Sequence, residues 1–155
     1  MTCACRVILC PTDLSPVSDD ALELAFTLAL PGGTVHLLHV LEEGVLATVG
    51  GGGPLPCATR MPRLLDALER ELETRQRRLR PRLAASGSVL HRVHVAHDLP
   101  PATAIERTAA DVQAELIVMG THGNGHHDHL TLGSVARDVL AHTHLPVLLA
   151  RPAVA

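Results

Sequence analysis

Two kinds of segment alternate along the chain. Short apolar runs are typical of buried strands, and they cover Arg6–Pro11, Val35–Val40, Val89–Ala96, Leu116–Met119 and Pro146–Ala150. Between these runs, apolar residues recur at steps of three and four, which is the spacing of one helix face. This spacing and its flanking prolines and glycines predict helices from Pro16 to about Leu30, from Met61 to Leu83, from Pro101 to about Gln113, and from near Ser134.

Five strands that alternate with four helices indicate right-handed βαβ units, and therefore a parallel sheet with helices on both faces. We predict a single α/β domain over residues 1–155, built as a doubly wound, Rossmann-like, five-stranded parallel sheet with strand order 3-2-1-4-5. The partly alternating run Val89–Ala96 is expected near a sheet edge, since central parallel strands are apolar on both faces. Residues of about 44–60 include Gly50–Gly53 and two prolines, which predicts a flexible surface loop.

Composition excludes several kinds of chemistry. All 13 Lys+Arg residues are arginine, the formal charge is −3, and 1% of the 155 residues are aromatic. Without lysine, Schiff-base catalysis, pyridoxal phosphate attachment and the Walker phosphate lysine are excluded. The acidic balance and the single phenylalanine argue against nucleic-acid binding. The arginine run from Arg75 to Arg82 leaves open a basic patch, but interleaved glutamates favour a solvated helix face.

The cysteines and the apolar runs bear on location. Cys3, Cys5 and Cys10 crowd into the first ten residues and Cys57 stands alone, so a disulfide framework is not expected and the pattern is typical of a reducing cytosol. The first apolar run is too short for a secretory signal, and no run approaches the ~20 residues of a membrane span. We therefore expect a cytoplasmic protein that does not enter a membrane.

Candidate chemistry lies where the first and fourth predicted strands end. In a doubly wound sheet, ligands bind beyond the carboxyl ends of the strands, where the strand order reverses. After the fourth strand, Gly120, Gly123 and Gly133 precede a helix start at Ser134. Glycines let backbone N–H groups approach a polyanion, and a helix N-terminus adds positive potential. This segment predicts a phosphate cradle without lysine, although glycines of this kind also serve tight turns.

The pattern Gly-x2-Gly-x9-Gly-Ser, filled by Gly120, Gly123, Gly133 and Ser134, is similar to the nucleotide motif of the ATP-binding branch of the universal stress protein family. Residues 7–15, 116–123 and 146–149 also resemble segments of that family, so the resemblance covers essentially the whole chain. It implies a nucleotide-dependent regulatory dimer of the stress response, paired along the fifth strand from Pro146 to Ala150. It also implies ATP, or ADP or AMP, as ligand, with Mg²⁺ on the phosphates.

The resemblance further implies which residues hold the nucleotide. Asp13 would contact the ribose and Val40 the adenine, while the glycine motif would hold the phosphates. The full set of nucleotide-binding residues implied in this way is Pro11, Thr12, Asp13, Val40, Met119, Gly120, His122, Gly123, Gly133, Ser134 and Val135. Two members also have ordinary interpretations: Asp13 can cap the first helix together with Ser15, and Val40 can be a plain strand residue.

Histidines replace the fixed positive charge that relatives often carry in this loop. The sequence here includes His126, His127, Asp128 and His129. Neutral imidazoles supply less positive charge, so we expect nucleotide affinity to rise as the pH falls from about 8 to 6. Imidazole and carboxylate also suit zinc, nickel or copper. Solvated loop histidines are nevertheless favoured over a metal site at His126, His127 and His129.

No catalytic residue is assigned. The loop offers no general base or arginine finger beyond His122, so at most slow ATP hydrolysis is expected. Two alternatives stay open: a slow ATP hydrolase or nucleotidyl-transfer enzyme on the same fold, and a nucleotide-free interaction protein.

Overall fold

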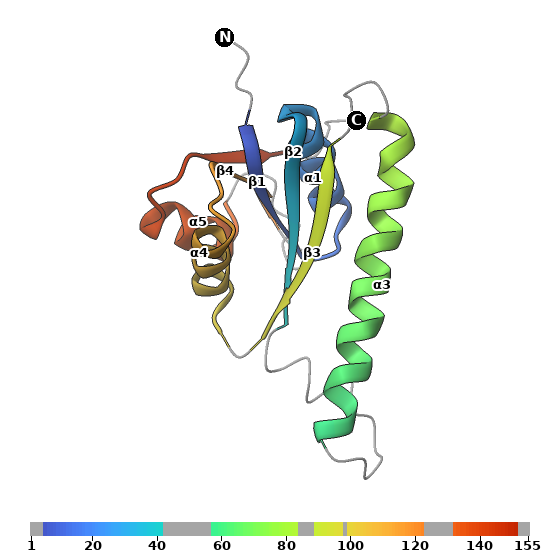
Figure 1. The fold of residues 1–155 in the computed structure, drawn as a ribbon. Helices are drawn as coiled ribbons and strands as arrows, with labels where there is room; N and C mark the ends of the chain where they lie inside the picture. Colours follow the sequence, from blue (N-terminus) through green and yellow to red (C-terminus); the bar gives the residue numbers. More distant parts are fainter. Residues whose placement is uncertain (1–4, 42–56, 84–88, 98, 123–131, 152–155) are drawn as a thin grey trace.

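One five-stranded sheet organises the chain (Figure 1). The computed structural model describes residues 5–41, 57–83, 89–97, 99–122 and 132–151, with side chains in the second range limited to 62–79. The strands are β1 (Cys5–Thr12), β2 (Ala29–Val40), β3 (Leu90–Ala96), β4 (Leu116–Gly120) and β5 (Val147–Ala150). The helices are α1 (Pro16–Leu28), α3 (Cys57–Leu83), α4 (Pro101–Asp111) and α5 (Ser134–His142). All neighbouring strands are parallel, in the order β3-β2-β1-β4-β5, which confirms the predicted fold class.

Helices cover both faces of the sheet (Figure 1). Val35 and Leu37 of β2 lie in a buried cluster with residues of α1 and α3. Leu38, the next residue, lies in a second buried cluster with residues of α4 and α5. Successive strand residues point to opposite faces, so β2 contributes residues to both clusters, as expected of a buried parallel sheet.

The boundary between α1 and β2 differs from the prediction. The helix ends at Leu28, and the strand runs through Pro31, Gly32 and Gly33 instead of beginning at Val35. The β1–β2 register shifts between Cys5 and Val7, and a Cβ on Gly33 would lie 2.7 Å from the carbonyl oxygen of Arg6. Glycine is therefore needed for the close approach of β1, and it does not end the paired segment.

Other boundaries shift by small amounts. α3 begins at Cys57, so the predicted loop to residue 60 is wrong at its end, while residues 42–56 lie outside the described residues. α4 ends at Asp111, ahead of the predicted Gln113, whose φ of 55° is left-handed and cannot continue a helix. The predicted edge position of β3 is confirmed.

Two histidines join the edge strand to its neighbour. His36 of β2 is buried, and its Nδ1 lies 2.8 Å from Nε2 of His94 on β3. The rings stack with centroids 5.1 Å apart. Burial, followed by His94 and Arg92, lowers the pKa of His36. Burial, followed by Arg92, lowers the pKa of His94, so the fold favours the neutral pair.

The two cysteines of β1 belong to the hydrophobic core. Cys5 and Cys10 are both buried. Burial, followed by the negative charge of Asp19, raises the pKa of the Cys10 thiol to about 12, so this thiol stays protonated in the core. None of the helices in the described ranges combines the length and apolar character needed to cross a membrane.

Candidate functional site

The strand order reverses between β1 and β4, which lie side by side in the sheet. Because all strands are parallel, their carboxyl ends meet at one edge. The structure brings most of the predicted site residues to this edge: Pro11, Thr12 and Asp13 at the end of β1, Val40 at the end of β2, Met119, Gly120 and His122 at the end of β4, and Gly133, Ser134 and Val135 at the start of α5. Gly123, His126, His127 and His129 lie outside the described residues.

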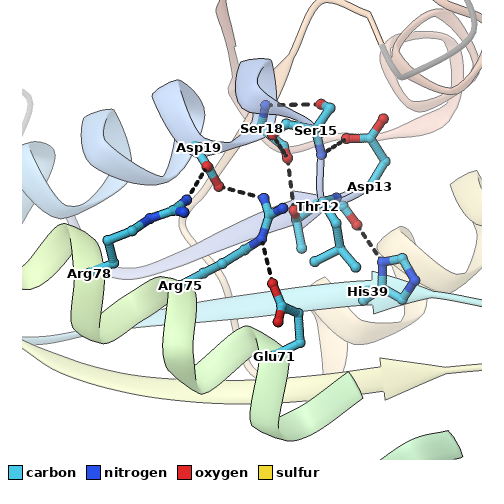
Figure 2. Close-up of polar contacts among 10 residues, drawn as sticks. Thr12, Asp13, Ser15, Ser18, Asp19, His39, Glu71, Arg75 and Arg78 are labelled. Atoms are coloured by element: carbon cyan, nitrogen blue, oxygen red, sulfur yellow. Dashed lines mark hydrogen bonds and ion pairs between the residues drawn. The ribbon is translucent and has the colours of Figure 1, made fainter. Parts of the chain in front are cut away.

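A chain of hydrogen bonds fixes the turn between β1 and α1 (Figure 2). The N–H of Leu14 donates to Thr12 Oγ1 at 3.0 Å, and Ser18 Oγ donates to the carbonyl of Ser15 at 2.7 Å. Thr12 Oγ1 and Ser18 Oγ lie 2.9 Å apart. Since the single hydroxyl proton of Ser18 is already used, Thr12 donates in this pair. These hydrogen bonds hold Leu14 in a left-handed conformation with φ 66°, which a leucine seldom adopts.

Asp13 is half-buried in the same turn. Its Oδ1 accepts a hydrogen bond from the N–H of Ser15 at 3.0 Å (Figure 2), which is an Asx turn. Ser15 is the N-cap of α1, and its Oγ accepts from the N–H of Ser18 at 3.3 Å. The ordinary interpretation therefore holds in part: Ser15 caps the helix, and Asp13 positions the cap. The carboxylate also lies at the edge where the strands end.

Beyond β4, one backbone hydrogen bond joins Thr121 to the end of β5 and a second brings the start of α5 to Thr121. Thr121 N–H donates to the carbonyl of Ala150 at 3.0 Å, and Gly133 N–H donates to the carbonyl of Thr121 at 2.8 Å. α5 therefore begins beside the end of β4. Its N-cap is Gly133, with no side-chain capping bond, and Ser134 at the first helical position is exposed. The first N–H groups of a helix have no partner within the helix, so this terminus can bind an anion.

Gly120 has a packing explanation of its own. A Cβ at this position would lie 3.1 Å from Cγ1 of Val17 in α1 and 3.3 Å from the carbonyl oxygen of His122. Both distances are tighter than ordinary van der Waals contact. A glycine is thus favoured here by the approach of α1, whether or not a phosphate binds. Gly120 alone does not distinguish a nucleotide site from a tight turn.

Two histidines lie at this edge. Nδ1 of His122 lies 2.8 Å from Thr121 Oγ1, while its Nε2 is buried with no hydrogen-bond partner in the described part of the chain. Nδ1 of His39 lies 2.8 Å from the carbonyl oxygen of Thr12 (Figure 2). A carbonyl only accepts, so Nδ1 of His39 carries the proton. His39 and Ser18 were not identified from the sequence; for His39 the available signal was a polar residue at the very end of an apolar strand.

Metal binding finds no support in the parts of the chain that the structure describes. Those residues include no group of three or more His, Cys, Asp or Glu side chains placed to hold a metal ion. The histidines proposed from the sequence as weak candidates fall within the undescribed residues 123–131.

Comparisons with known proteins agree on one family. The family model described as the universal stress protein family matches residues 5–151. A universal stress protein of Methanocaldococcus jannaschii is 30% identical over 147 residues, covering 94% of this chain and 82% of that protein. The solved structure of a hypothetical protein is 26% identical, with 94% of each chain covered and a TM-score of 0.72.

Two similar structures were solved with adenine nucleotides. A universal stress protein in complex with cAMP is 19% identical, covers 96% of this chain and 98% of its own, and has a TM-score of 0.61. The universal stress protein of Archaeoglobus fulgidus in complex with dAMP is 21% identical. The match covers 93% of this chain and 95% of that protein, with a TM-score of 0.55. At these identities the likeness concerns the fold.

Proposed function

The chain belongs to the universal stress protein family, and from that premise we propose that it binds an adenine nucleotide, ATP with Mg²⁺ in the first place, at the carboxyl edge of its sheet. The observation that carries the proposal is the start of α5. Gly133 N–H donates to the carbonyl of Thr121 at 2.8 Å, and within the described residues no side chain caps the helix that follows. An uncapped N-terminus at the strand-order reversal suits a phosphate group.

The remaining residues have roles that suit their chemistry. The half-buried carboxylate of Asp13 would accept hydrogen bonds from ribose hydroxyls. Val40 would pack on the purine face, and Ser134 would donate to a phosphate through its hydroxyl and its N–H. Pro11, Thr12, Met119, Gly120, His122, Gly123 and Val135 complete the proposed set. Relatives of the same fold in complex with cAMP and dAMP support an adenine nucleotide as the class of ligand.

The proposal extends to assembly and role. We infer a cytoplasmic stress-response protein that acts as a nucleotide-dependent homodimer, paired through β5. β5 is an edge strand, and Leu148 on it and Leu140 on the adjoining α5 are 37% and 45% exposed in the single chain. An open edge with exposed leucines is suited to pairing with a second copy. Leu148→Arg is therefore expected to shift the protein to a monomer in analytical ultracentrifugation.

Isothermal titration calorimetry tests the binding claim. The full chain is titrated with ATP, ADP, AMP and cAMP, each with and without Mg²⁺, after mass spectrometry of the native protein has identified any nucleotide that co-purifies. Saturable binding of at least one adenine nucleotide is expected. No heat at high micromolar concentrations of all four, with no nucleotide co-purifying, would contradict the proposal.

A further inference from the structure

The first turn of α1 connects the proposed site to α3. Ser15 accepts from Ser18 and is itself positioned by Asp13. Ser18 bonds to Thr12 at the end of β1, and Val17 packs against Gly120 at the end of β4. Consecutive residues of one helical turn therefore contact both strands between which the nucleotide is proposed to bind.

Asp19, the next residue of this turn, faces away from the sheet edge and contacts α3 (Figure 2). Its Oδ1 lies 2.7 Å from Arg75 Nη1, and its Oδ2 lies 2.8 Å from Arg78 Nη2. Arg75 also pairs with Glu71 at 3.4 Å. The side chains of Asp19 and Arg75 are only 19% and 17% exposed, so this ion pair is less screened by solvent than a surface pair.

The docked face of α3 combines apolar residues with a buried polar side chain. Within its described residues, Leu72 and Leu79 are buried, and Gln76 lies between them with 2% exposure. Among the described residues, both polar atoms of the buried Gln76 amide have no hydrogen-bond partner, which opposes docking. The buried amide offsets part of the apolar gain, and the ion pairs to Asp19 add a direct attachment between α3 and α1.

We propose that Asp19 is a positioning residue through which docking of α3 and nucleotide binding are coupled, an inference that rests on the proposed function. With Arg75 and Arg78 engaged, the first turn of α1 is held where Thr12, Asp13 and Gly120 form the site. By linkage, a nucleotide that orders this turn strengthens the docking of α3. Loss of the ion pairs weakens nucleotide binding by the same factor. α3 is then the element that reports whether the site is occupied.

The Asp19→Asn variant distinguishes a positioning role of Asp19 from a long-range effect of its charge on the nucleotide. Removal of a negative charge near an anion site raises anion affinity if long-range electrostatics is the whole effect. The positioning role predicts the opposite, a loss of ATP affinity of about 3- to 30-fold. Arg75→Met is expected to cause a similar loss, and the double variant should lose little more than either single variant. The matched control is Glu73→Gln with Arg77→Met, an exposed i,i+4 pair within α3 at 3.3 Å.

Amide hydrogen exchange supplies a readout that a general loss of stability would not reproduce. ATP should slow exchange in α3 of the wild type and of the control, and should do so far less in Asp19→Asn at a saturating concentration. The coupling alone is overturned if Asp19→Asn binds ATP as tightly as the wild type or more tightly. It is also overturned if ATP does not change hydrogen exchange in α3 of the wild type. A wild type that binds no adenine nucleotide overturns the proposed function, and this inference with it.

Discussion

The start of α5 allows the backbone contribution to phosphate binding to be measured. Ser134 occupies the first helical position, where Ser134→Pro would remove one N–H and one hydroxyl, while Ser134→Ala removes the hydroxyl alone. Proline is tolerated at this position because its N–H has no partner within the helix. α1 and α4 already begin with Pro16 and Pro101. Gly133, with φ −62° and ψ 155°, has the extended conformation that precedes proline.

The magnitude follows from one charge-assisted hydrogen bond. A backbone N–H that donates to a phosphate oxygen contributes about 1.5–3 kcal/mol. Its loss in Ser134→Pro should therefore weaken ATP binding by about 10- to 150-fold relative to Ser134→Ala. Thermal unfolding of the two variants should agree within a few degrees, since a proline at the first helical position does not break the helix.

Calorimetry of the wild type, Ser134→Ala and Ser134→Pro with ATP and Mg²⁺ gives the comparison directly. Equal affinities of Ser134→Ala and Ser134→Pro, both folded, would refute the reasoning, because no N–H of this residue would then contact the ligand. A deficit confined to Ser134→Pro would instead identify the backbone, and not the hydroxyl, as the donor.

Three further predictions follow from other parts of the molecule. Gln76→Met keeps the shape of a buried side chain while removing two polar atoms that have no partner among the described residues, and should raise the free energy of unfolding in urea by about 1–3 kcal/mol. A loss of stability would mean that the amide has a partner. The lowered pKa values of His36 and His94 mean that the unfolded chain, with histidine pKa near 6.5, binds more protons on acidification. Stability should therefore fall as pH drops below 6.5, by up to about 1.4 kcal/mol per pH unit for each histidine; His36→Gln should flatten this slope, and His142→Gln, an exposed control, should keep it. Nucleotide affinity should rise between about pH 8 and 6 as the loop histidines gain charge; an affinity measured by calorimetry that stays flat would show that they do not act on the ligand.

The order of elements could be predicted because each strand and helix has a local signature. Leu116–Gly120 is apolar without interruption, and Pro101 marks a helix start, so the sheet and its layers follow from alternation alone. The start of β2 could not be predicted in this way. Whether Gly33 ends a helix or continues a strand depends on the carbonyl of Arg6, which reaches it only once β1 and β2 pair.

The residues of the candidate site differ in the same way: local sequence indicates some of them, and tertiary packing determines the others. The position of Asp13, Gly133 and Ser134 at the sheet edge could be predicted, because they lie where predicted strands end and a predicted helix begins. His39 could not, because its role depends on the register that sets it opposite Thr12. Ser18 is an ordinary helix residue by sequence. It becomes part of the β1–α1 hydrogen-bond network only because the hydroxyl of Thr12 lies beside it. Partners of hydroxyl and imidazole groups are set by tertiary packing, which a single sequence does not specify.

The α3 arginines whose ion pairs the structure describes lie away from the proposed phosphates. Arg75 and Arg78 engage Asp19 and so help to attach α3 to α1, while Arg77 pairs with Glu73 within α3. Phosphate recognition near Ser134 would then depend on backbone N–H groups, whose strength is set by direction more than by net charge. Direction is a property of the turns that hold these groups. A site of this kind is therefore sensitive to how the first turn of α1 is held, which is what the ion pairs of Asp19 control.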